Sequence, residues 1–310
     1  STLFPYTTLF RSVLHTLTSV MIPIGLLILS GVVAKLVLNP DLRVLARINL
    51  YVLSPALVFH CLANSRASSS SLLTLGLGTL LLSFALTGLA TLWSKLRRYG
   101  RAETSGFYLA TVFANAGNFG LPVTMATLGT KGTDIAIAII VVQQILMFTL
   151  GVYLASRSNL SVKASLCAVA RMPSVYAALL AILHRQNVFV VGRIGLQLAS
   201  LLTQAAIPLF LILLGAQVSS HKFGWRNRTV YAASAFRLVT APIIALSIAK
   251  LLGIDSFGTN VFVLESAMPT AVITTMLAVE YNASPAMVSC VTLLTTVASI
   301  VTIPIVLALF

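Results

Sequence analysis

Acidic residues are scarce in this chain, whose 310 residues include only 6 Asp or Glu against 20 Lys or Arg. Charged residues of both signs make up 8% of the sequence, whereas soluble domains carry roughly 25% because their surfaces face water. A hydrophobic share of 58% and a mean hydropathy of +1.00 accompany this deficit. The shortage of charge excludes a soluble globular protein of this size and predicts an integral membrane protein.

The sequence also lacks the common motifs of metal sites, disulfide frameworks and hydrolases. Cys61, Cys167 and Cys290 lie far apart and form no CxxC pair, so neither a disulfide framework nor a metal site is expected. The four histidines form no HExxH motif, and the isolated acids form no catalytic pair. We therefore expect no enzyme activity and no cofactor, with an intramembrane enzyme or a membrane sensor as remote alternatives.

The first twelve residues have an unusual character. Ser1–Ser12 reads STLFPYTTLFRS, and all 12 residues match the in-frame translation of a common sequencing adapter. We expect this segment to be an artefact rather than part of the fold, and the native chain to begin near Val13.

Long apolar runs are what the chain does contain. A hydrocarbon core of about 30 Å takes about 20 helical residues to cross, and charge-free runs of that length recur along the sequence. The ten expected spans cover residues 15–37, 44–64, 70–94, 104–129, 133–156, 173–191, 194–218, 229–252, 257–280 and 285–310. The predicted fold class is therefore an all-α polytopic protein with ten transmembrane helices.

The basic residues predict the orientation of these spans. With the N-terminus outside, most Lys and Arg fall in cytoplasmic loops, as the positive-inside rule requires. The cytoplasmic set is Lys35, Arg43, Arg47, Lys95, Arg97, Arg98, Arg101, Arg157, Lys163, Arg171, Lys222, Arg226 and Arg228, and the outer set is Arg66, Lys131, Arg185, Arg193 and Lys250. Both termini are then expected outside the cytoplasm, in the inner (plasma) membrane. The net charge of +14 gives no reason to expect a nucleic-acid partner.

Prolines recur at matching places in two halves of the chain. Pro55 and Pro208 fall inside the second and seventh spans, and Pro122 and Pro269 fall inside the fourth and ninth. Five spans per half is an odd number, so the second half enters the membrane from the opposite side, as in transporters with inverted repeats. Helix breaks are expected at Ser54, Pro55 and Pro208. The predicted boundaries are 13–156 for the first repeat, 157–172 for a cytoplasmic connection and 173–310 for the second repeat.

Polar residues gather where the fourth and ninth spans are interrupted. The fourth reads FANAGNFGLP from Phe113, and its proline removes a helical hydrogen bond. The ninth reads ESAMPTAVITT from Glu265. Half-helix N-termini at such crossings carry partial positive charge, and no Asp occupies either one, so we expect a small organic anion such as a carboxylate. The expected substrate-binding residues are Asn115, Asn118, Gly120, Pro122, Met268, Pro269 and Thr270.

Two charged residues fall well inside spans. Glu265 lies in the ninth span and Arg237 in the eighth, where a buried charge is costly unless it is paired or hydrated. The sequence leaves several roles open: an ion pair between the two residues, ion coupling by Glu265, attraction of substrate by Arg237, or exposure to an aqueous path.

Three motifs resemble those of one transporter family. Asn115, Gly120 and Pro122 match an N-x-x-x-x-G-x-P element of the auxin efflux carrier family, which is related to the plant PIN carriers. The run AMPTAV, followed by AVEYNASP at 278–285, and the stretch AIPLFLILLGAQVS in the seventh span are also similar to that family. The resemblance covers nearly the whole chain from Met21 onward and is closest to the compact bacterial type. Asn118 departs from the apolar residue of many plant members.

The resemblance implies a fold shared with bile-acid symporters and sodium–proton antiporters. It implies a scaffold of spans 1, 2, 6 and 7, a mobile domain of crossing broken helices, and elevator-like alternating access. It also implies an anion bound near Asn115 and Pro122, with Pro269 as the second-half counterpart, and a possible homodimer. We expect a carrier that exports or exchanges a small organic anion, with possible proton or sodium coupling. A sodium-coupled organic-anion symporter of the bile-acid type is the alternative.

Overall fold

The computed structural model describes residues 22–64, 69–156, 173–218 and 228–310, and all regular structure in these ranges is helical. The adapter-like start and the connection at 157–172 lie outside the described residues. Many large apolar side chains face outward; Ile194 is 84% exposed, Leu251 80% and Leu73 74%. A surface of this kind fits a lipid environment better than water.

Five helical stretches are long and apolar enough to cross a membrane. They are Ser70–Leu96, Ala116–Ser156, Arg193–Gln217, Arg228–Leu251 and Pro285–Ala308. Shorter apolar helices cover Ile22–Leu38 and Tyr51–Asn64. These stretches make the described chain an all-helical integral membrane protein.

The helices follow the expected spans closely in both halves. The first half holds α2 (Ile22–Leu38), α3 (Leu42–Ile48), η2 (Asn49–Leu53), α4 (Ser54–Asn64), α5 (Ser69–Leu96), α6 (Arg101–Val112), η3 (Ala116–Gly120), α7 (Leu121–Leu146), η4 (Met147–Gly151) and α8 (Val152–Ser156). The second half holds α10 (Pro173–Arg185), α11 (Arg193–Val218), α12 (Arg228–Ala235), η5 (Phe236–Thr240), α13 (Ala241–Leu251), α14 (Ser256–Ser266), α15 (Ile273–Glu280) and α16 (Pro285–Ala308). Only α10 is markedly shorter than expected: it ends at Arg185, whereas the expected sixth span reaches residue 191.

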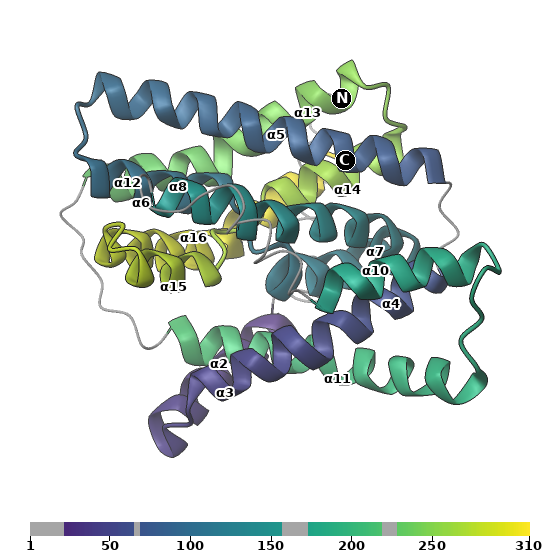
Figure 1. Cartoon of the computed structure of the whole chain (residues 1–310). Helices are drawn as coiled ribbons and strands as arrows, with labels where there is room; N and C mark the ends of the chain where they lie inside the picture. Colours follow the sequence, from purple (N-terminus) through teal and green to yellow (C-terminus); the bar gives the residue numbers. More distant parts are fainter. Residues whose placement is uncertain (1–21, 65–68, 157–172, 219–227) are drawn as a thin grey trace, which may run out of the picture.

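Two groups of helices make up the bundle (Figure 1). In one, α2 packs on α11 and α4 packs on α10 and α11, in the lower part of the view. The other contains α5 to α8 and α12 to α16. The contact between α2 and α11 is very close, because a Cβ added at Gly31 would overlap the carbonyl of Ile212 and one added at Gly215 would overlap that of Ile28.

The long helix α7 doubles back near Gly129. That residue has φ 65° and ψ −163°, outside the helical region. A Cβ added at Gly132 would lie 3.3 Å from Cγ2 of Thr124, although eight residues of straight helix span about 12 Å. The fourth and fifth expected spans are therefore separate arms that meet at this turn.

Three of the four described π-helical segments lie directly before a proline. η2 precedes Pro55, η3 precedes Pro122 and η5 precedes Pro242, each with one residue between segment and proline. Proline cannot donate to the carbonyl four residues earlier, so the preceding turn widens to i→i−5 bonds such as Gly120 N to Asn115 O, at 2.9 Å. Widened turns of this kind redirect the side chains that they carry.

Two helices are interrupted, and their interruptions lie side by side. The first falls at Phe113–Asn115, between α6 and η3, and the second between α14 and α15. Ala114 and Thr270 form an antiparallel bridge, with Asn115 N donating to Pro269 O at 2.7 Å and Ala271 N to Phe113 O at 3.0 Å.

The interruption expected within Phe113–Pro122 lies at the start of that segment rather than at Pro122. The helix that contains Pro122 has already resumed at Ala116, because the π-helical turn η3 absorbs the hydrogen bond that the proline removes. Ser54 and Pro55 likewise begin α4 immediately after η2, without a gap, and Pro208 lies inside the continuous helix α11. Among the expected breaks, only the one at Pro269 is an open interruption.

Candidate functional site

A cavity of about 720 Å³ lies against the two interruptions. Ala114 and Asn115 from the first interruption and Ala271 and Val272 from the second line this cavity. The start of α15 at Ile273 also lines it, so two helix N-termini, η3 and α15, adjoin the cavity. The first N–H groups of a helix lack intrahelical acceptors and carry partial positive charge.

Six amide side chains dominate the polar lining. They are Asn49 on η2, Asn115 and Asn118 at η3, Gln143 and Gln144 on α7, and Gln217 on α11. The charged residues among the lining are Arg47 and Glu280, both exposed. A neutral, hydrogen-bonding lining of this kind fixes the orientation of a ligand rather than pairing with a large charge.

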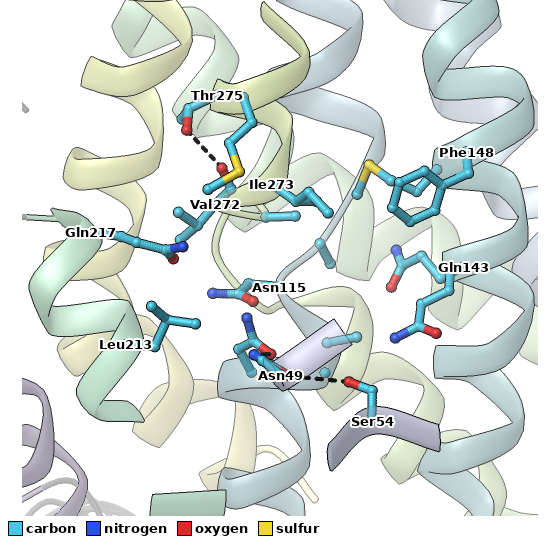
Figure 2. A pocket seen from close by; sticks show the side chains of 18 of the residues that line it. Asn49, Ser54, Asn115, Gln143, Phe148, Leu213, Gln217, Val272, Ile273 and Thr275 are labelled. Atoms are coloured by element: carbon cyan, nitrogen blue, oxygen red, sulfur yellow. Dashed lines mark hydrogen bonds between the residues drawn. The ribbon is translucent and has the colours of Figure 1, made fainter. Parts of the chain in front are cut away.

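Asn49, Ser54 and Asn118 form a hydrogen-bonded chain on one wall of the cavity. Ser54 Oγ donates to Asn49 Oδ1 at 3.1 Å, and Asn49 Nδ2 donates to Asn118 Oδ1 at 3.3 Å. Figure 2 shows the Ser54–Asn49 bond at the base of the view. These contacts join the π-helical turns η2 and η3, so the positions of Asn49 and Asn118 depend on each other.

Asn115 lies at the centre of the cavity, between Gln217 on one side and Gln143 on the other (Figure 2). Its side chain is only 4% exposed, and its Nδ2 has no hydrogen-bond partner among the described residues. The side-chain oxygens of Gln143 and Gln144 also lack such a partner. Buried polar groups are normally satisfied, so unpaired groups that face a cavity indicate where a ligand or water binds.

Arg237 ties together the ends of the two interrupted helices. Its side chain is fully buried on η5, and Nη1 donates to Thr111 O at 3.0 Å and to Val112 O at 3.1 Å, at the end of α6. Nη2 donates to Ser266 O at the end of α14. Helix C-termini carry partial negative charge and unpaired carbonyls, and one guanidinium satisfies both needs here.

Glu265 is buried one residue before the end of α14, beside the second interruption, and lies outside the cavity lining. It is 1% exposed, and its Oε1 accepts a hydrogen bond from Thr124 Oγ1 at 2.6 Å. The structure does not pair it with Arg237: the described partners of Arg237 are backbone carbonyls. The ion pair considered from the sequence is therefore absent among the described residues.

The expected binding residues divide into two groups. Asn115 and Asn118 line the cavity, whereas the remaining five are buried behind it: Gly120, Pro122, Met268, Pro269 and Thr270. Thr270 hydrogen-bonds Thr295 and Ala110, and Met268 packs in an apolar cluster with Leu264 and Phe119. These five pack at the crossing of the chain and do not line the cavity.

Four amide side chains that line the cavity are not among the residues predicted from the sequence: Asn49, Gln143, Gln144 and Gln217. All four fall in predicted spans, outside the two interrupted segments that begin at Phe113 and Glu265. Amides inside apolar helices are uncommon and often face other helices, so this signal could have flagged them.

A family model described as membrane transport protein matches residues 10–307. The chain belongs to this family, the auxin efflux carriers. It is similar to an uncharacterized transporter of Methanothermobacter thermautotrophicus, with 28% identity over 291 residues that cover 93% of this chain and 96% of the relative. It is also similar to an uncharacterized transporter of Methanocaldococcus jannaschii, with 26% identity over 268 residues that cover 84% of this chain and 87% of the relative.

Membership of the auxin efflux carrier family makes the protein a membrane transport protein. This agrees with the expectation of a transporter.

A second cavity, of about 1160 Å³, lies further along two helices of this carrier. On α4 it is lined by His60 and Asn64, whereas Ser54 of the same helix lines the first cavity. On α11 it is lined by Ser200 through Pro208, whereas Gln217 reaches the first cavity. The two cavities therefore adjoin opposite ends of α4 and different levels of α11.

Proposed function

We propose that this protein is a secondary carrier that exports or exchanges a small organic anion, bound in the amide-lined cavity. The observation that carries the proposal is the position of Asn115, which lines the cavity where two interrupted helices meet and whose buried Nδ2 has no partner among the described residues. A carboxylate oxygen is the natural acceptor for that group.

The partial charges at the helix ends beside the cavity support an anionic substrate. Arg237 caps the C-terminal carbonyls of α6 and α14, so the negative helix ends are neutralised. The N-terminal ends of η3 and α15 adjoin the cavity without a buried acid in its lining. The partial positive charge of these ends is then available to a bound anion.

The apolar part of the lining supports an organic substrate. Leu213, Val272, Ile273 and Phe148 surround the amides, as Figure 2 shows. A volume of about 720 Å³ lies within the range of small-molecule sites. Dicarboxylates such as malate and indole acids both meet these requirements.

We further propose that the fold is two inverted five-helix repeats and that transport follows an elevator-like path. The helix pairings support the repeat: α2 packs on α11 and α10 packs on α4, so the first helix of each half meets the second helix of the other. The second cavity supports alternating access, because it adjoins the opposite end of α4 and a different level of α11 from the first cavity. By the positive-inside rule the first cavity then opens toward the cytoplasm.

A thermal-shift screen of carboxylates on the purified protein tests the binding site. We expect malate or indole-3-acetate to raise the unfolding temperature of the wild type, and Asn115→Ala to abolish that stabilisation. Asn260→Ala is the matched control, because Asn260 lies on α14 outside the first cavity. Stabilisation that survives Asn115→Ala would contradict the proposed site, and a sodium requirement would favour a sodium-coupled symporter.

A further inference from the structure

Glu265 is a buried acid that the binding site does not use. Its Oε1 accepts from Thr124 Oγ1, but its Oε2 has no hydrogen-bond partner among the described residues. Oε2 fills the space beside Gly120, where a Cβ would overlap it. The carboxyl group is thus enclosed between α14, η3 and α7.

The charged groups around Glu265 are few. The elements that pack on α14 include α7, α13, η3 and α16, and their ionisable residues are Lys131 and Asp134 on α7, Lys250 on α13 and the buried thiol of Cys290 on α16. Lys131 lies over the ring of Phe257, about two turns of α14 away from Glu265. Arg237 is nearer, but its described bonds go to carbonyls, including that of Ser266.

A carboxylate enclosed in this way is costly unless a cation neutralises it. Hard metal cations take about six or more oxygen ligands, and the side-chain oxygens described beside Oε2 are those of Glu265 and Thr124, so a metal ion would also need backbone carbonyls or water. A proton, in contrast, binds to a single oxygen atom, and Oε2 of Glu265 is available for it. We propose that Glu265 is a proton-binding site of the carrier, and that its protonation is linked to binding of the anion.

The link follows from the position of Glu265, and it rests on the proposed function of the cavity. Gly120, which Glu265 touches, ends the same π-helical turn that begins beside Asn115. Five residues of helix span roughly 7.5 Å, so a charge on Glu265 would lie close enough to repel an anion at Asn115. Protonation removes this repulsion, and reciprocity requires that the anion in turn favours the proton.

Infrared titration of the purified carrier without added ligand tests the proton site directly. We expect a carboxylic-acid carbonyl band that is lost as the pH rises and is missing in Glu265→Gln. Glu103→Gln is the matched control, because Glu103 accepts a similar bond from Thr229 Oγ1 at 2.7 Å but lies in the first turn of α6. The control should keep the band.

Two results would overturn the proton site. One is a spectrum with no Glu265-dependent band at any pH; the other is a band that responds to sodium at constant pH. If Glu265→Gln fails to fold, Thr124→Val serves instead: removing the Thr124 hydrogen bond should move the midpoint of the same band, and an unmoved midpoint counts against the assignment.

The linkage is tested by the affinity for malate and indole-3-acetate at roughly pH 6–9, above the titration of the probe carboxyl groups. Affinity should fall by up to about tenfold per pH unit in the wild type, the limit for one linked proton, and stay flat in Glu265→Gln. A flat wild-type profile contradicts the linkage. Failure of both probes to bind counts against the proposed function, whereas the infrared titration judges the proton site independently.

Discussion

Replacing Arg237 by Met should destabilise the protein strongly, although the two side chains are similar in length. The change removes three hydrogen bonds from a charged donor to Thr111, Val112 and Ser266, worth roughly 5–9 kcal/mol together. Against this, Met avoids the burial of a guanidinium, which costs several kcal/mol. We expect a net loss of about 2–5 kcal/mol in the free energy of unfolding.

Unfolding of the purified protein in SDS, followed by circular dichroism, measures this loss. Arg193→Met is the matched control, because Arg193 is exposed at the start of α11 and should change stability by less than about 0.5 kcal/mol. Arg237→Lys should fall between Met and the wild type, since it keeps the charge but not the fork that reaches two helix ends. Equal stability of Arg237→Met and the wild type would refute the role assigned to this residue.

Two glycine substitutions test close packing, each by the same unfolding measurement. Gly31→Ala should cost about 3 kcal/mol or more by forcing α2 away from Ile212 on α11, whereas Gly25→Ala, with open space around it, should be nearly neutral. Gly120→Ala should cost about 1–3 kcal/mol because the added methyl displaces the Glu265 carboxyl, whereas Gly117→Ala makes only an ordinary contact at 3.8 Å. A loss as large in the controls as in the tests would show that the glycines matter through helix flexibility, not contact.

The helices could be predicted from the sequence because hydrophobic length determines them. The described helices coincide with the expected spans within a few residues over most of the chain. The turn at Gly129 also falls where a break between the fourth and fifth spans was expected. Apolar run length and loop composition act locally, so they can be read along the chain.

The exact place of the first interruption could not be predicted in this way. Pro122 was a reasonable marker because proline removes a hydrogen bond, yet the π-helical turn η3 absorbs that loss and the chain opens at Phe113–Asn115 instead. Tertiary contacts keep this interruption open, namely the bridge from Ala114 to Thr270 and the hydrogen bonds that Arg237 donates to the end of α6. Such contacts join residues more than 100 positions apart and leave no local pattern.

The residues that line the cavity could also be predicted only in part from the sequence. Glycine and proline surround Asn115 and Asn118 in the sequence, whereas Asn49 and Gln217 are each surrounded by mostly apolar residues. Only the packing of α11 and η2 around η3 brings these amides together. The sequence therefore predicts Asn115 and Asn118, whereas only the structure places Asn49 and Gln217 beside them.

Counterflow in liposomes tests the central claim most directly. Vesicles loaded with unlabelled malate or indole-3-acetate should accumulate the labelled form of the same compound when they contain the wild-type protein. Asn115→Ala should lose at least about 90% of this uptake, because a hydrogen bond to a charged group contributes about 1.5–3 kcal/mol and 1.4 kcal/mol is tenfold in affinity, and Asn260→Ala should retain it. Equal counterflow by Asn115→Ala and the wild type would contradict the account.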